Sequence, residues 1–129
     1  TITANRNHYL RLKTNKQLDA LIDAGIKEDF TIGFADKAGF RLSTCRPVRY
    51  INPETLKVED LILHPLTMMD GSFSTYQKMD FAQAYDTACK LIEQVKKHGG
   101  ELVLLWHNSE VVDGNYHKQL YKNLISYII

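Results

Sequence analysis

The stretch Glu101-Leu-Val-Leu-Leu-Trp-His-Asn108 decides the fold, because an apolar run stops abruptly at a histidine. The run follows Gly99-Gly100 and is too short for a helix. It therefore predicts a parallel strand that is buried on both faces. Ligands of parallel α/β sheets gather where the strands end at their carboxyl edge. We therefore expect His107 to lie at the ligand-binding edge of such a sheet.

Three roles fit a histidine at that edge. Imidazole can transfer protons near neutral pH, so His107 is a candidate general acid or base. Its neutral ring could also bind a metal ion. The third role is structural, in which the ring bonds to a backbone carbonyl at the strand end. The position alone leaves all three open.

Composition predicts a single globular domain over residues 1–129. The 129 residues are 44% hydrophobic, which is ordinary for a chain that buries a core. The formal charge is +1, and the 16 basic residues are scattered, so no nucleic-acid partner is expected. Cys45 and Cys89 match no zinc or redox spacing, which favours two reduced thiols.

No targeting or membrane segment is expected from the sequence. The start, Thr1-Ile-Thr-Ala-Asn5, has neither the basic nor the apolar region of a signal peptide, and it reads as a trimmed chain. No apolar stretch approaches the ~20 residues that a membrane span requires. The compartment therefore stays unknown, with the cytoplasm slightly favoured.

Hydrophobic periodicity predicts alternating strands and helices. We expect strands over 2–12, 30–34, 61–69 and 102–107, and an irregular segment over 37–53. Helices are expected over 14–24, 80–98 and 116–128, the second opened by a capping box of Asp80 and Gln83. This order predicts an α/β fold with a mainly parallel sheet and flanking helices. Four strands amount to about half of an eightfold α/β barrel.

Four segments, in order, resemble a known family. They are Arg6-Asn-His-Tyr-Leu-Arg11, Gly33-Phe-Ala-Asp36, the loop from Gly39 to Pro47, and Leu105-Trp-His-Asn108. Together they resemble the carboxyl-terminal half of NodB-homology polysaccharide deacetylases, which are carbohydrate esterases. The resemblance covers nearly the whole chain. It implies part of a distorted, incomplete α/β barrel.

The resemblance implies catalytic roles for three residues. In the family's Leu-x-x-His motif, His107 is the general acid that protonates the leaving amine. Arg6 begins the Arg-x-Pro-Tyr motif and orients the catalytic base, although His8 stands where the family usually has proline. Asp36 is the carboxylate that holds Arg6, although the tryptophan that often accompanies it is absent.

The resemblance also implies three substrate-binding residues. Leu104 lines a pocket for the acetyl methyl group. The backbone N–H of Tyr9 stabilises the oxyanion. Trp106 contacts the sugar, so the partner expected for the chain is an N-acetylated sugar or polysaccharide.

The metal-binding part of the family's site has no counterpart in the sequence. The family binds a divalent ion, zinc or similar, through an Asp-Asp pair and a His-x-x-x-His pair that precede the segment seen here. No Asp-Asp pair occurs, and no two of the five histidines have that spacing. We therefore expect no cofactor in this chain and no deacetylation without the amino-terminal half. The alternative is a non-catalytic carbohydrate-binding or assembly module.

The remaining histidines and arginines have simpler interpretations. We expect His64 to be structural, His98 to interact with a helix dipole and His117 to be solvated. The arginines of the irregular segment are predicted either to clamp an acidic group or to lie in solvent: Arg41, Arg46 and Arg49. Half a barrel leaves sheet edges without partners, so we expect a homodimer.

Overall fold

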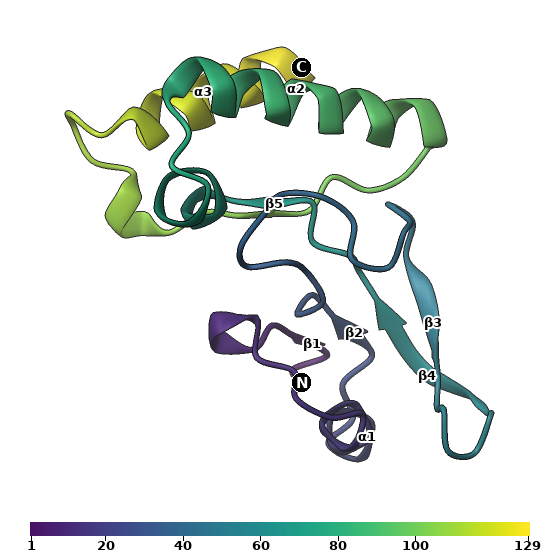
Figure 1. Ribbon diagram of the computed structural model, residues 1–129. Helices are drawn as coiled ribbons and strands as arrows, with labels where there is room; N and C mark the ends of the chain where they lie inside the picture. Colours follow the sequence, from purple (N-terminus) through teal and green to yellow (C-terminus); the bar gives the residue numbers. More distant parts are fainter.

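Six strands, three α-helices and three short helical turns make up the computed structural model, which describes residues 1–129 (Figure 1). The strands are short, and three of the helices have at least two turns. The elements are β1 (Ala4–Asn5), η1 (His8–Leu10), α1 (Lys16–Asp23), β2 (Glu28–Asp29), β3 (Val48–Ile51), β4 (Val58–Leu63), β5 (Met68–Met69), η2 (Ser72–Tyr76), α2 (Phe81–His98), β6 (Leu104–Leu105), η3 (Asn108–Glu110) and α3 (Tyr116–Ile128).

The strands form two sheets that are mainly parallel. The first has the order β1-β2-β4-β3, in which only β3 is antiparallel, and the second pairs β5 with β6 in parallel. Residues between β4 and β5 link the two sheets, because the Leu66 N–H donates to the Ile32 carbonyl and the Thr67 N–H to the Val103 carbonyl. The fold is therefore mixed α/β, as predicted, and neither sheet closes into a barrel.

Several predicted strand boundaries are wrong. The strand expected over 2–12 is reduced to β1, because the backbone turns at Tyr9 and Leu10, which both have positive φ. The strand expected over 30–34 forms earlier, at β2. Part of the segment expected to be irregular is β3, which pairs with β4. Pro65, which lacks an N–H, lies in the interruption that divides the strand expected over 61–69 into β4 and β5.

The predicted helices are confirmed, and the best one has the predicted cap. In α2 the Asp80 carboxylate accepts from the Gln83 N–H at 2.8 Å, and the Gln83 side chain accepts from the Asp80 N–H at 3.1 Å. At the other end Gly99 has a φ of 59°, a left-handed conformation that glycine adopts without steric cost. Arg46 covers this end through two bonds from its guanidinium to the His98 carbonyl.

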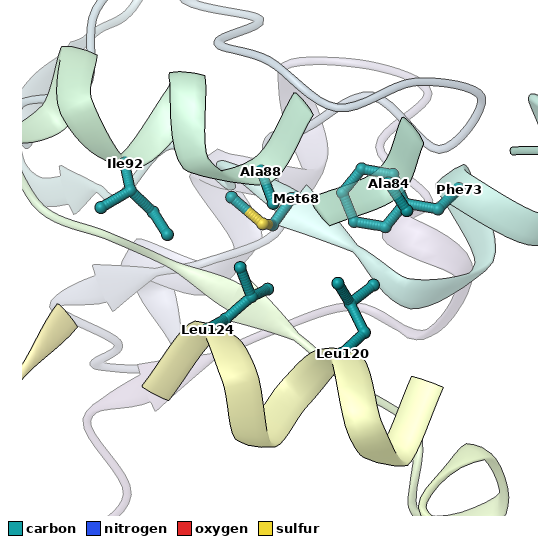
Figure 2. Packing of buried hydrophobic residues seen from close by; sticks show 7 residues of the cluster. All are labelled: Met68, Phe73, Ala84, Ala88, Ile92, Leu120 and Leu124. Carbon is teal, nitrogen blue, oxygen red and sulfur yellow. The ribbon is translucent and has the colours of Figure 1, made fainter. Parts of the chain in front are cut away.

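The largest cluster of buried apolar residues lies between the second sheet and the helix pair α2 and α3 (Figure 2). Its members come from β5, η2 and both helices: Met68, Phe73, Ala84, Ala88, Ile92, Leu120 and Leu124. Small alanines on α2 let α3 approach closely, and leucines fill the space between them. This packing holds the second sheet, and with it the end of β6, against the helices.

Truncating a leucine of this cluster tests the packing. Leu120 is fully buried, so Leu120→Ala should lower the free energy of unfolding by about 2–5 kcal/mol through lost burial and the cavity that remains. Urea denaturation followed by circular dichroism measures the change. Ile129→Ala is the control, because Ile129 is 98% exposed and its truncation should have little effect. Equal losses in the two variants would contradict the packing.

Candidate functional site

A fully buried carboxylate lies at the carboxyl end of β5. Asp70 follows Met69 directly and has no exposed surface. Its Oδ1 accepts hydrogen bonds from the Gly71 N–H at 2.6 Å and from His107 Nδ1 at 2.7 Å. Its Oδ2 accepts from the His107 N–H at 2.6 Å. Three donors thus stabilise a charge that would be very costly to bury alone.

One ring nitrogen of His107 faces this carboxylate. The rest of the ring faces the protein surface. His107 follows β6, and its side chain is 47% exposed. An ionised carboxylate can only accept, so the bond to Asp70 places a proton on Nδ1. Nε2 is then the nitrogen that can give or take a proton. The carboxylate also fixes the orientation of the ring, as in histidines that act as acids or bases.

A second buried carboxylate fixes the segment that carries Arg6. Asp29 ends β2 and is fully buried. It accepts from the Asn5 side chain at 2.8 Å and from the Thr31 hydroxyl at 2.7 Å. The same hydroxyl accepts from the Asn7 N–H at 2.9 Å. The residues on both sides of Arg6 are therefore tied to β2, which explains why polar residues occupy this part of the sequence.

The Arg6 guanidinium connects the two sheets. Its Nε donates to the Phe30 carbonyl at 3.1 Å, and Nη1 donates to the Leu104 carbonyl at 3.4 Å. The group also lies 5.8 Å from the centre of the Phe30 ring. Burial lowers the pKa of Arg6, and the Asp29 carboxylate acts in the opposite direction. Arg6 thus remains a cation that lies between the end of β2 and β6.

Tyr9 has an unusual backbone. Its φ is 58° and its ψ is 20°, a left-handed conformation that costs energy for a residue other than glycine. The side chain is 83% exposed and stacks on His8 with the ring centres 4.2 Å apart. The Tyr9 N–H has no hydrogen-bond acceptor within the chain. This donor is therefore free to bind a ligand.

One cavity of about 490 Å³ is lined by Arg6, Tyr9 and His107. Residues 6–10 supply part of its lining, and His107 lies in the same lining. Met69 and Leu105 add apolar surface, and Tyr76 from η2 adds a second exposed aromatic ring. The structure therefore brings Arg6, Tyr9 and His107 together, as their predicted roles require. The cavity combines a cation, an imidazole and aromatic rings.

Three predicted site residues lie elsewhere. Asp36 is exposed and outside the cavity, and the carboxylate that acts on Arg6 is Asp29. Leu104 packs on the large apolar cluster, because neighbouring side chains of a strand point to opposite faces, and Leu105 lines the cavity instead. Trp106 packs against side chains of η2 and α3 rather than lining the cavity.

His117 is buried, so the prediction that it is solvated is wrong. Only 2% of its surface is exposed, because the first turn of α3 presses it against Trp106. Burial lowers the pKa of His117 more than the carboxylates of Asp70 and Glu110 raise it. The ring is therefore neutral at physiological pH.

His64 and the arginines of the irregular segment have structural positions. His64 is buried, stacks on Phe30, and bonds to Glu101 through Nδ1 at 2.7 Å. The three arginines do not form a clamp. Arg46 caps α2, Arg49 lies 3.9 Å from an Asp60 oxygen, and Arg41 donates to the Gly33 carbonyl. A second cavity, of about 430 Å³, lies beside Arg46 and contains no comparable acid–base pair.

Sequence reasoning missed Asp70 and Asp29. The strand expected over 61–69 ends directly before Asp70, but Asp70-Gly71 indicated only a turn there, and no role in the site was assigned to Asp70. The signal that could have revealed both is an aspartate at the carboxyl end of a short strand. The two strands belong to different sheets, so this signal predicts an acidic group at the carboxyl edge of each sheet.

Comparisons with known proteins give no match. No family model matches the chain, and neither a curated protein nor a solved structure is similar to it at a significant level. No helix combines the length and the apolar composition needed to cross a membrane. The site must therefore be interpreted from its own chemistry.

Replacing the buried carboxylate tests its structural importance. In Asp70→Asn one oxygen becomes an NH₂ group that faces N–H donors, so the free energy of unfolding should fall by about 2–4 kcal/mol. Chemical denaturation measures the loss. Asp36→Asn, at an exposed position, should change stability by less than about 0.5 kcal/mol. If both variants were equally stable, the hydrogen bonds to Asp70 would not hold the site together.

The buried neutral ring of His117 should make folding sensitive to acid. Because its pKa is lowered in the folded state, the unfolded chain binds the proton first as pH falls below about 6.5. Stability should then decrease by up to about 1.4 kcal/mol per pH unit from this group, with no such contribution at higher pH. Denaturation midpoints at pH 7.5, 6.0 and 5.0 measure the dependence. His117→Phe should be less sensitive than the native chain, and an unchanged slope would refute this.

Proposed function

We propose that this chain is the carboxyl-terminal portion of a polysaccharide deacetylase-like domain. The observation that carries the proposal is the pairing of His107 with the buried Asp70 in the cavity that Arg6 and Tyr9 also line. The parallel pairing of β1, β2 and β4 in one sheet, and of β5 with β6 in the other, supports a fragment of an incomplete α/β barrel. Its substrate class is an N-acetylated sugar or polysaccharide.

His107 is the general acid of the proposed reaction. In its protonated form it keeps Nδ1–H on Asp70 and presents Nε2–H to the amide nitrogen of the substrate. When the C–N bond breaks, this proton moves to the nitrogen, so that the sugar leaves as a free amine and acetate remains. Asp70 stabilises the imidazolium and does not itself transfer a proton, because it is enclosed by three donors.

Arg6 and Tyr9 supply positive charge and a free donor to the same cavity. In an intact parent, the guanidinium of Arg6 would orient a carboxylate base contributed by the amino-terminal half. The N–H of Tyr9 has no internal acceptor, so it can stabilise negative charge on the carbonyl oxygen. The strained backbone at Tyr9 is typical of residues that are held in place for function.

The residues of this chain do not fit the metal centre of the family. No three side chains among histidines, cysteines, aspartates and glutamates lie close enough together to hold a metal ion. The activation of water is therefore assigned to no residue here. In the proposal, that part of the reaction belongs to the amino-terminal half of an intact parent.

A non-catalytic carbohydrate-binding module is the second candidate. Its support is the pair of exposed aromatic side chains in the cavity, Tyr9 and Tyr76, which are 83% and 56% exposed. Aromatic faces pack against the apolar faces of sugar rings, and they need no acid–base group to do so. Binding of a sugar without turnover, in a protein that includes the preceding segment, would favour this candidate.

Turnover in a protein that carries the preceding segment tests the enzymatic proposal. His107→Gln removes the proton donor, so the release of free amines from a chito-oligosaccharide should fall about 10²–10⁴-fold. Asp70→Asn should also lower turnover, because the imidazole loses the group that orients it. His98→Gln is the control, because His98 lies at the exposed end of α2. Unchanged turnover in a folded His107→Gln variant would overturn the assignment.

A further inference from the structure

Three buried polar atoms beside the Asp70–His107 pair have no hydrogen-bond partner in the protein. They are the indole N–H of Trp106 and both ring nitrogens of His117. The two rings contact each other edge to face, with their centres 6.0 Å apart. Only 2% of the surface of His117 is exposed. Two side chains in contact therefore carry three buried polar atoms without a partner.

Buried polar atoms in native proteins nearly always have a partner, because an unpaired one costs free energy. The chemistry of the three atoms defines which partner fits. Tryptophan offers only a donor, whereas a neutral imidazole offers one donor and one acceptor. Burial keeps His117 neutral, since it lowers the pKa of the ring. The indole donor and one nitrogen of His117 match a molecule that both accepts and donates, as water does.

The position of these atoms connects them to the acid–base pair. Trp106 immediately precedes His107, so a hydrogen bond to the indole also restrains the backbone between β6 and His107. His117 lies in the first turn of α3, where its N–H donates to the Asn115 side chain at 3.0 Å. The Asp70 carboxylate is near enough to act on the pKa of His117. Asp70 Oδ2 accepts only one hydrogen bond and can accept another.

We propose that Trp106 and His117 form a buried binding site for one water molecule, and that this site positions His107 against Asp70 from the side of α3. The water accepts from the indole N–H and bonds to one nitrogen of His117. Trp106 and His117 are then positioning residues, which act on the cavity only through His107 and Asp70. The inference goes beyond the proposed deacetylation and would hold for any role of the pair.

Nuclear magnetic resonance of the intact chain tests occupancy of the site. A long-lived internal water should give a cross-relaxation peak with the indole proton of Trp106. His117→Phe, which removes both nitrogens of the site, should abolish that peak. The same substitution should shift the low-field resonance of the His107 Nδ1 proton that bonds to Asp70. His117→Gln, which keeps a donor and an acceptor, should restore the peak and leave that resonance near its native position.

Stability measurements separate a water site from a dry one. If water binds, Trp106→Phe and His117→Phe should each lower the denaturation midpoint, and the double variant should lose less than the sum, since no water partner is then left half-bonded. In a dry site, His117→Phe would raise the midpoint, because it removes unpaired polar atoms without emptying the space.

Tyr121→Phe is the matched control for the cycle. Tyr121 also packs on Trp106, with ring centres 5.7 Å apart, but its hydroxyl is not among the buried unpaired atoms. Tyr121→Phe keeps the ring and removes only the hydroxyl, so its coupling to Trp106→Phe should be smaller than that of His117→Phe. A raised midpoint in His117→Phe, or no water peak at Trp106 in the native chain, would overturn the proposal. None of these outcomes depends on deacetylase activity, so they test the water site separately from the proposed function.

Discussion

The need to surround the buried Asp70 carboxylate with donors is the constraint on which the site depends. A charge without exposed surface is tolerated only when its oxygens are bonded. Two of its three donors come from His107, one from the backbone and one from the ring. The carboxylate therefore fixes both where β6 ends and how the imidazole turns. Structural stability and the orientation of a reactive group follow from the same hydrogen bonds.

Asp29 is buried under the same constraint in the other sheet. It too is fully buried at the end of a parallel strand, and its donors are Asn5 and Thr31. These bonds hold the segment before η1 and thus the backbone of Arg6. The two buried acids lie behind the cavity rather than in its lining, and each holds a chain segment that carries a cavity residue. A polar interior of this kind gives a rigid support for groups that must stay in fixed positions.

The α/β class and the three helices could be predicted from the sequence, because periodicity and capping residues are local signals. The expectation that Arg6 and His107 share a site came from the resemblance to a family and not from these signals. The strand bounds were less accessible, since β1, β2, β5 and β6 have only two residues each and depend on pairing with distant segments. Leu105 lines the cavity instead of the predicted Leu104, because the face to which a strand residue points cannot be predicted before the neighbouring strands are known. The prediction that His117 is solvated is wrong for a similar reason, because only the packing of α3 on Trp106 buries it.

The Arg6 guanidinium bonds to the carbonyl of Phe30, which directly follows β2 of the first sheet, and to the carbonyl of Leu104 in β6 of the second. The guanidinium has five N–H groups, so an anionic guest in the cavity can bind the three that these bonds leave free or displace the carbonyls from the other two. Displacement of the carbonyls would loosen the contact between the edges of the two sheets. By thermodynamic reciprocity, conditions that separate those edges would raise the affinity for the guest. A single side chain would in this way couple occupancy of the cavity to the width of the gap between β1 and β6.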